Sequence, residues 1–231
     1  MRITIALLLF ISFAIPVRAQ KTDVDAVVNS VINTLGGREK LLSVNSIKKS
    51  GNIEFGGQKI PFNYYAINKK AQRTEFVFSG MTGYFIVTKD SGYNFNPFQG
   101  QTSADNMTAE DVKLAQDDLD LGTTLVDYKS KGYTIDLLEN EDVDGVDAFQ
   151  LKITISPNKT LFYFIDPSGY YIIRIKTVTI SNGQQNVDST DYYNFKKTKE
   201  GILYAYTFGN ITFDSIEINI PLDEKLFKPV R

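Results

Sequence analysis

Two clusters of acidic residues are the most obvious candidates for chemistry in this sequence. The first is the stretch ENEDVDGVD, which carries Glu139, Glu141, Asp142, Asp144 and Asp147. The cluster superficially resembles a calcium loop, but such a loop needs a third acid before its Asp-Gly pair, where Val143 stands, and a bidentate glutamate six residues after the glycine, where Leu151 stands. We therefore interpret Asp144-Gly145 as the turn of a β-hairpin and predict no metal site.

The second cluster is the stretch DDLD, with Asp117, Asp118 and Asp120. Two carboxylates that flank a glycosidic bond can serve as the acid and the nucleophile of a glycosidase. The alternative is a helix whose acidic face is exposed to solvent, and we favour this second interpretation.

Most other catalytic arrangements are excluded by composition, because the 231 residues include no histidine and no cysteine. Ser-His-Asp and Cys-His relays and the usual zinc sites all need these side chains. The sequence also lacks a Gly-x-Ser-x-Gly elbow, a P-loop and a Gly-x-Gly-x-x-Gly turn. We predict that the protein is not an enzyme and has no cofactor.

Aromatic side chains are abundant in this chain, which has 13 tyrosines and 16 phenylalanines but no tryptophan. Many lie two residues apart on predicted strands, so that they point to the same side. They could form an ordinary β core, or part of them could line a cavity for an apolar ligand. The candidate ligand-binding residues, from strands and helices together, are Val28, Phe55, Phe62, Tyr64, Phe76, Phe78, Phe95, Val112, Leu119, Phe149 and Phe164.

Residues 1–19 have the pattern of a secretory signal peptide. Arg2 is followed by an apolar run from Ile3 to Ile15, and Val17-Arg18-Ala19 forms a cleavage site before Gln20. The apolar run is shorter than the roughly 20 residues that a membrane-spanning helix needs. We expect a mature domain of residues 20–231 that does not span the membrane.

The missing cysteine excludes disulfides and a lipid-modified cysteine at the cleavage site. Export without disulfides favours a bacterial periplasm over a eukaryotic extracellular space. Loss of Arg2 and Arg18 reduces the 25 basic residues to 23 against 27 acidic ones, a net charge of −4. This charge gives no electrostatic reason to expect binding to nucleic acid.

Residues 24–35 are predicted to form an amphipathic helix, capped by Thr22 and ended by Gly36-Gly37. Apolar residues recur at helical spacing on one wide face: Val24, Val27, Val28, Val31, Ile32 and Leu35. Most of these residues are β-branched and are poor formers of an isolated helix. The helix must therefore be stabilised by docking this face on the rest of the fold.

From Ile47 onward, the sequence predicts about eleven or twelve antiparallel strands joined by short turns. The turns are Gly56-Gly57, Asn68-Lys69-Lys70, Ser79-Gly80, Asp90-Ser91-Gly92, Asp144-Gly145, Pro157-Asn158, Pro167-Ser168-Gly169, Asn182-Gly183 and Gly209-Asn210. So many strands in one sheet must curl or close. The segments LFYFID and YYIIRI are apolar on both faces, so we expect both faces of the sheet to be covered there.

The segment 92–122 interrupts this strand pattern. A helix from Thr108 to Leu121 is predicted, with a narrow apolar stripe of Val112, Ala115 and Leu119. We expect this helix to dock weakly, as a movable lid, with the aromatic residues Tyr93, Phe95 and Phe98 at its hinge and rim.

The succession of motifs from about Asp23 to the end is specific, although each motif alone is weak. It runs through LGGREKLLSVNSIKKSGNIEFGGQKIPF, NPFQG, an acidic helix, LVDYKSKGY, VDGVDAFQLKI, FYFIDPSGYYIIRIK and IEINIPLDEKLFKP. This order resembles the LolA-like family of outer-membrane lipoprotein-sorting proteins. The resemblance implies an unclosed antiparallel β-barrel, mainly β with a helical lid, whose helices cover the concave face around an apolar cavity.

The same resemblance implies acyl chains of lipoproteins or other lipids as ligands, an inner-membrane donor and an outer-membrane acceptor. Two functions remain open. The protein could be a periplasmic carrier of such chains, or a lipid-sensing interaction domain of the same fold that regulates a partner and transports nothing.

Overall fold

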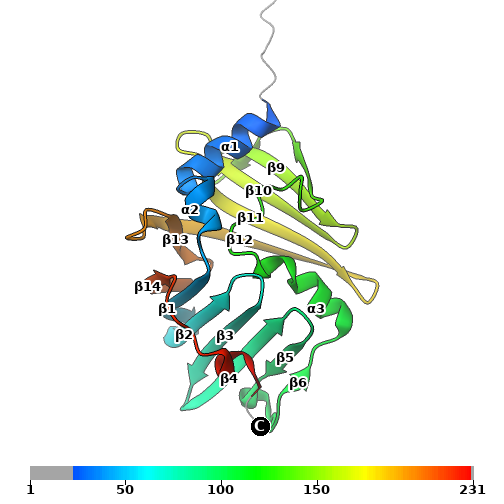
Figure 1. The fold of residues 1–231 in the computed structure, drawn as a ribbon, viewed down its shortest axis with the longest axis vertical. Coiled ribbons are helices and arrows are strands. Elements are labelled where there is room, and N and C mark those ends of the chain that lie inside the picture. Colours follow the sequence, from blue (N-terminus) through cyan, green and yellow to red (C-terminus); the bar gives the residue numbers. More distant parts are fainter. Residues whose placement is uncertain (1–22, 230–231) are drawn as a thin grey trace, which may run out of the picture.

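The computed structural model describes residues 23–229, and their core is one antiparallel sheet of 14 strands (Figure 1). The first six strands are β1 (Ser46–Phe55), β2 (Gln58–Ile67), β3 (Ala71–Phe78), β4 (Met81–Thr88), β5 (Gly92–Phe95) and β6 (Asp105–Asn106). The others are β7 (Thr134–Leu137), β8 (Glu141–Val143), β9 (Val146–Ser156), β10 (Lys159–Asp166), β11 (Tyr171–Ser181), β12 (Gln184–Lys197), β13 (Leu203–Phe208) and β14 (Ile211–Ile218).

The strand order is β6-β5-β4-β3-β2-β1-β14-β13-β12-β11-β10-β9-β7, with β8 paired to β9 outside this path. The strands β6 and β7 are the two edges of the sheet and do not pair with each other. The sheet therefore does not close into a barrel, as expected. All the predicted turns are found, including Asp144-Gly145 between β8 and β9. The strand number exceeds the expected eleven or twelve, and the structure contains very short strands such as β6 and β8.

The first half of the sheet and the second half meet at one seam, where β1 pairs with β14. The register shifts between Ser50 and Gly51, whose partners Ser215 and Phe213 skip Asp214, so β14 carries a β-bulge opposite Gly51. A Cβ atom on Gly51 would lie 2.0 Å from the carbonyl oxygen of Thr212 and 2.6 Å from the Cα atom of Phe213. Only glycine allows the backbones to approach this closely.

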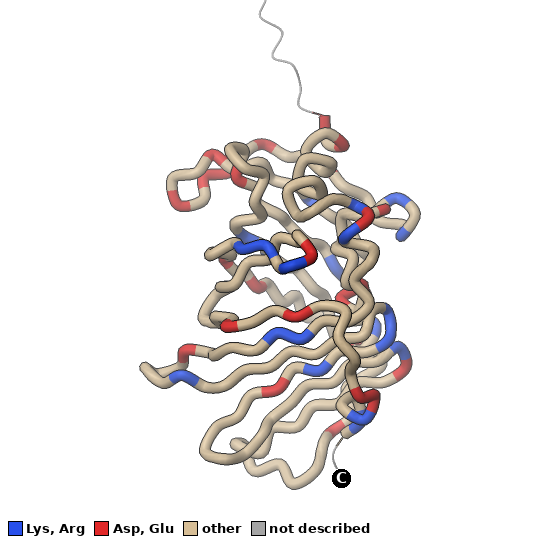
Figure 2. Tube along the Cα trace, turned by 60° about the vertical axis from the view of Figure 1, so that its left-hand side comes forward, with Lys and Arg blue, Asp and Glu red and all other residues tan. Residues whose placement is uncertain are grey.

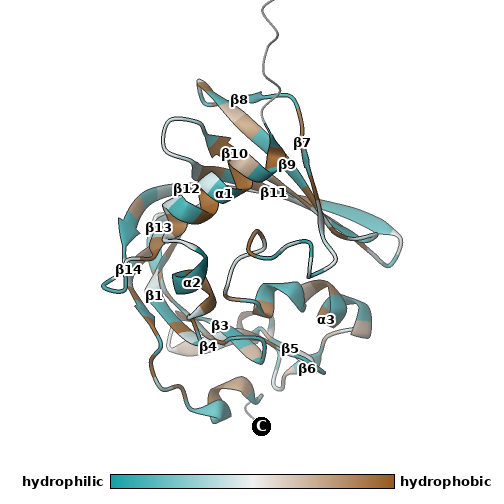
Figure 3. Ribbon diagram, turned by 45° about the horizontal axis from the view of Figure 1, so that its top comes forward, coloured by the Kyte–Doolittle hydropathy of each residue, from teal (hydrophilic) through white to brown (hydrophobic). Residues whose placement is uncertain are grey.

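Two helices lie inside the curve of the sheet (Figure 3). The first, α1 (Val24–Leu35), has the predicted bounds, but its N-cap is Asp23 rather than Thr22, because the Asp23 carboxylate accepts a hydrogen bond from the Asp25 amide. Gly36 ends it with φ of 129°. The second, α2 (Arg38–Leu42), follows at once and was not predicted, since it is only five residues long.

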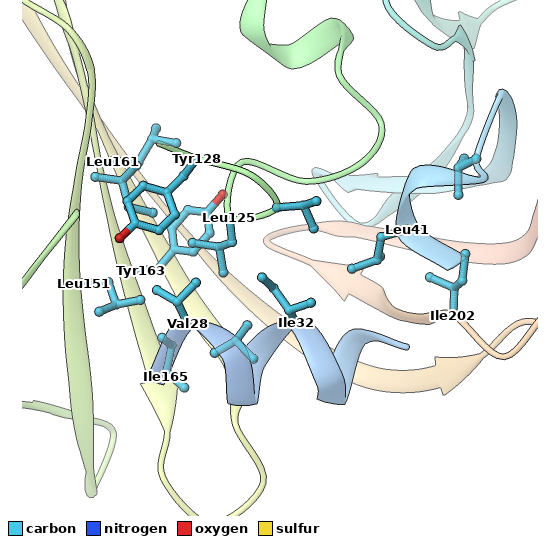
Figure 4. Packing of buried hydrophobic residues seen from close by; sticks show 14 of the residues in the cluster. Val28, Ile32, Leu41, Leu125, Tyr128, Leu151, Leu161, Tyr163, Ile165 and Ile202 are labelled. Carbon is cyan, nitrogen blue, oxygen red and sulfur yellow. The ribbon is translucent and has the colours of Figure 1, made fainter. Parts of the chain in front are cut away.

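The apolar face of α1 packs into the main core. Val28 and Ile32 point toward Leu151, Leu161 and other side chains of β9 and β10 (Figure 4). The loop after the second predicted helix also fills this space with Leu125, Val126 and Tyr128, all buried. Docking of α1 on the sheet, rather than helix propensity, therefore stabilises this β-branched helix.

The other face of the sheet is covered at two places. The β8–β9 hairpin folds over β10, so that Val143 and Ala148 bury Phe164. The 3₁₀ helix η3 (Glu224–Phe227) covers β3 and β4, where Phe227 packs against Tyr84 and Ile86. The expectation that LFYFID is covered on both sides is thus confirmed.

Charged residues occur along strands and at turns, with basic and acidic positions interspersed in the view of Figure 2. Within residues 23–229, no helix has both the length and the apolar character needed to cross a membrane. The predicted signal peptide lies outside the described residues.

Candidate functional site

The pairing register determines which of the candidate residues face the helices. Phe62 on β2 is opposite Phe76 on β3 and Gly51 on β1, and it belongs to the same core cluster as α1. Side chains two residues apart share a face, so Tyr64 and Phe78 point to this concave side as well. The sequence pattern had therefore found part of the concave face correctly.

A continuous line of rings crosses this face. Phe76 is paired with Phe62, whose ring centroid lies 6.0 Å from that of Phe213. Phe213 is 5.4 Å from Phe208, and Phe208 stacks on Tyr192 at 6.0 Å. We call these five residues the aromatic row. It spans β3, β2, β14, β13 and β12, and most of its members are only partly buried.

An apolar pocket of about 420 Å³ lies at the Phe76 end of the aromatic row. Its lining residues are Phe55, Gly56, Gln58, Ile60, Phe76, Phe78 and Phe98. Phe98, in the 3₁₀ helix η1 (Pro97–Gln99), packs against Phe76 at 5.5 Å and against Phe78 at 5.8 Å. The volume lies within the range of small-molecule sites, and apolar side chains dominate the walls. Phe55, at the rim, is 72% exposed.

Lys49 of β1 lies beside the aromatic row. Its ammonium nitrogen is 5.4 Å from the ring centroid of Phe213, 5.4 Å from that of Tyr64 and 5.3 Å from that of Tyr204. Burial lowers the pKa of Lys49 to about 8. Burial likewise raises the pKa of Tyr64, whose hydroxyl donates a hydrogen bond to Gln72 at 3.0 Å. The face is thus mainly aromatic, and the Lys49 ammonium lies among its rings.

The interrupting segment forms the expected helix. Thr108 caps α3 (Ala109–Ala115) by accepting a hydrogen bond from the Asp111 amide at 3.1 Å. The 3₁₀ helix η2 (Asp117–Leu119) follows, so the helical part is shorter than predicted. We call residues 108–121 the lid segment. Its apolar residues Val112 and Leu119 are buried, the latter only 3% exposed.

Polar contacts fasten the lid segment to β10 and to the β11–β12 hairpin. The buried Lys159 ammonium donates to the Leu114 carbonyl and the Asp117 carboxylate, both at 2.9 Å, and to Asp118 at 3.1 Å. The Ser181 hydroxyl donates to Asp111 at 2.9 Å, and the Asn182 amide donates to Glu110 at 3.1 Å.

The other end of the lid segment is fastened to the opposite half of the sheet. Gln116 donates to the Lys89 carbonyl at 2.6 Å, and the Lys69 amide donates to the Leu119 carbonyl at 2.7 Å. The expectation of weak docking is therefore wrong. The apolar stripe is narrow, but residues on the acidic side provide the missing contacts.

The interpretation of DDLD as a solvent-exposed face is also wrong for two of its acids. Asp117 contacts Lys159, and Asp120 lies 3.0 Å from the Lys131 ammonium, with side chains 12% and 16% exposed. Burial raises the pKa of Asp118, and the charge of Lys159 opposes this rise. Basic residues far away in sequence have turned an apparently free acidic face into an attachment site.

Two candidate residues lie on the wrong face. Phe95 packs against Tyr84 at 5.2 Å in the cluster under η3, and Phe164 lies beneath the β8–β9 hairpin. Both side chains point away from the helices, because successive residues of a strand face opposite sides of the sheet and these two lie on the outer side. Val28 is buried in the main core, and Phe149 stacks with Tyr170 at 6.2 Å beside that core.

Four residues of the concave face are absent from the predicted candidates: Lys49, Tyr192, Phe208 and Phe213. A signal was present for Lys49, since it shares its strand alternation with Ile47, Gly51 and Ile53. The position of Phe213 depends on the β-bulge in β14 at Asp214, which no local pattern indicates. Within residues 23–229, no group of three or more acids is placed to hold a metal ion.

Two solved structures are similar in fold. A domain named for outer membrane lipoprotein sorting, from Vibrio parahaemolyticus, aligns with a TM-score of 0.51 and 11% identity, over 87% of this chain and 94% of its own. A LolA superfamily protein from Nitrosomonas europaea aligns with a TM-score of 0.50 and 12% identity, over 87% and 97%. No family model and no curated protein matches the sequence. The likeness identifies a LolA-like fold.

Proposed function

We propose that this LolA-like fold serves here as a non-enzymatic binding protein for acyl chains of lipids or lipoproteins, which it carries through the periplasm. The observation that supports the proposal best is the aromatic row ending in the apolar pocket beside Phe98. The two structural neighbours, named for lipoprotein sorting and for the LolA superfamily, support the same function class.

The physical need for such a carrier follows from the hydrophobic effect. Each methylene group that leaves water gains about 0.8 kcal/mol, so a long acyl chain gains on the order of 10 kcal/mol when fully enclosed. The aromatic row offers a path along which a chain can lie, and rings contribute large contact areas. A container that shields the chain makes its passage between two membranes possible.

The test begins with the protein as isolated from cells that export it. Its lipids are extracted and identified, and the lipid-free protein is titrated with a fluorescent acyl probe. Near-stoichiometric lipid and saturable probe binding support the proposal, whereas an empty protein that binds no probe contradicts it. Transfer of the bound lipid to acceptor vesicles distinguishes the carrier from the lipid-sensing regulator.

Replacing Phe98 by alanine should weaken binding of the acyl probe about tenfold, because part of the ring surface covering the pocket is lost. The thermal midpoint should fall only slightly, since Phe98 lies in a short 3₁₀ helix at the surface and is not part of the main core. Probe titration and thermal unfolding of the same samples measure the two effects.

Tyr193→Ala is the matched control, because Tyr193 is 50% exposed and its strand neighbour Tyr192 faces the concave side instead. The control should bind the probe like the parent protein. If both variants lose the same probe affinity, the probe binds to any exposed ring, and the pocket is not its specific binding site.

The localisation part of the proposal rests on the leader sequence. Intact-mass measurement of protein isolated from the periplasm should give a chain that begins at Gln20. A retained Met1 or a fatty acylated N-terminus would exclude a free periplasmic carrier.

A further inference from the structure

Lys49 is unusual for its position in the sheet. It lies in the middle of β1, on the side of the strand that carries the core residue Ile47 and the tightly packed Gly51. Its ammonium group is surrounded by the rings of Tyr64, Tyr204 and Phe213. A charged side chain at such a site lowers stability unless something compensates its charge.

Lys49 is half-buried, and the two cations of the sheet that are fully buried, Arg73 and Lys159, have carboxylate partners. Arg73 donates to Glu75 at 2.8 Å, and Lys159 binds Asp117 at 2.9 Å. Among residues 23–229, no hydrogen-bond acceptor or acid contacts the ammonium of Lys49. Ring faces attract a cation, but they do not accept its three hydrogen bonds as oxygens would.

Lys49 also lies where the head of a ligand could reach it. Its ammonium lies over Phe213, the central member of the aromatic row. Its pairing partner on β2 is Tyr64, which lies on the same face of that strand as Phe62, two residues away. From this point the row leads through Phe62 and Phe76 to the apolar pocket. The arrangement therefore joins one cation to an apolar track of ring faces.

We infer that the ligand is an anionic amphiphile, whose negatively charged head group pairs with the Lys49 ammonium while its acyl tail follows the aromatic row toward the apolar pocket. This inference rests on the proposed acyl-binding function and specifies the head group. A carboxylate or a phosphate supplies the oxygen acceptors that the protein lacks at this position, and a charge-assisted hydrogen bond in a poorly solvated site is strong. Burial lowers the pKa of Lys49 to about 8, so most molecules still carry the positive charge at pH 7.

The test compares ligands with one chain length and different heads. Hexadecanoic acid, hexadecyl phosphate and hexadecanol displace a neutral fluorescent probe from the lipid-free protein at pH 7. One or both of the anions should bind at least tenfold more tightly than the alcohol. In Lys49→Met this preference should disappear, while hexadecanol binds as well as before or better. Which anion is preferred distinguishes a fatty acid carboxylate from a lipid phosphate.

Lys196→Met is the control variant, because the Lys196 ammonium of β12 also lies over a ring, 5.0 Å from the centroid of Tyr206 on the neighbouring β13, but its side chain is exposed. It should keep the preference for the anions. An equal loss in both variants would indicate general charge attraction and overturn the inference.

The outcomes separate the two levels of the proposal. If the alcohol binds as tightly as the anions, acyl binding stands and the anionic head group is refuted. If none of the three compounds displaces the probe and the probe itself does not bind, the proposed acyl-binding function fails as well.

Discussion

Replacing Gly51 by alanine is expected to lower the free energy of unfolding by at least about 3 kcal/mol. The new Cβ atom would lie 2.0 Å from the Thr212 carbonyl oxygen, which belongs to the backbone of β14 and cannot turn away as a side chain could. The bulge opposite Gly51 lies in the seam between the two halves of the sheet. Its loss should therefore loosen the pairing that holds the half-barrel together.

Urea unfolding followed by tyrosine fluorescence and circular dichroism measures this effect. Gly57→Ala is the control, since Gly57 lies in the β1–β2 turn with φ of 77° and no heavy atom near its added Cβ. Its destabilisation should be about 1 kcal/mol, from backbone strain alone. Similar losses in the two variants would show that β1 and β14 do not approach as closely as described.

Replacing Lys159 by alanine is expected to destabilise the protein by about 3–5 kcal/mol, because it leaves the Leu114 carbonyl and the Asp117 carboxylate, which is only 12% exposed, without this donor. The Lys159 side chain is 6% exposed and holds the Leu114 carbonyl and the carboxylates of Asp117 and Asp118. The lid segment should then separate from β10, and amide exchange in residues 108–121 should accelerate well before global unfolding.

The loss in Lys159→Ala should depend on pH with a definite sign. Burial raises the pKa of Asp118, and without the opposing charge of Lys159 this pKa should rise further. A carboxyl group whose pKa is higher in the folded than in the unfolded state favours folding more as the pH falls through that pKa. The difference from the parent protein should therefore shrink toward pH 4.

Lys113→Ala serves as the control for this experiment. Lys113 lies on α3 within the lid segment, is exposed and has no carboxylate within ion-pair distance among the described residues. Its replacement should change stability by less than about 0.5 kcal/mol. A loss of that small size for Lys159 too would mean that the lid segment is held by its apolar contacts alone, as the sequence had suggested.

The two acidic stretches, ENEDVDGVD and DDLD, show which features a local sequence pattern can predict, because the first was interpreted correctly and the second was not. The hairpin at Asp144-Gly145 was predicted correctly, because both residues adopt positive φ, of 53° and 87°, in a turn that depends on its own two residues. Asp117 and Asp120 were assigned to solvent, since their partners Lys159 and Lys131 are separated from them in the sequence. The pattern around an acid does not reveal a distant cation.

The candidate site divides in the same way. Alternation placed Phe62, Tyr64, Phe76 and Phe78 together on one face, and the structure agrees. Phe164 lies on a strand with apolar residues on both faces, so the pattern could not say which face the helices cover. Phe95 lies on the four-residue strand β5, whose alternation pairs it with Tyr93 but does not say which side of the sheet the two rings face.

The sequence by itself determined the elements that depend on near neighbours: the amphipathic helix from Val24 to Leu35, the turns, the strand alternation and hence the mainly antiparallel fold. Turn geometry and side-chain periodicity are local, so a few residues suffice to specify them. The tertiary structure alone decided the bulge opposite Gly51, the attachment of the lid segment by Lys159 and the ring contacts of Lys49. Each of these joins segments many residues apart, and the close packing that selects such contacts exists only after the whole sheet has curved.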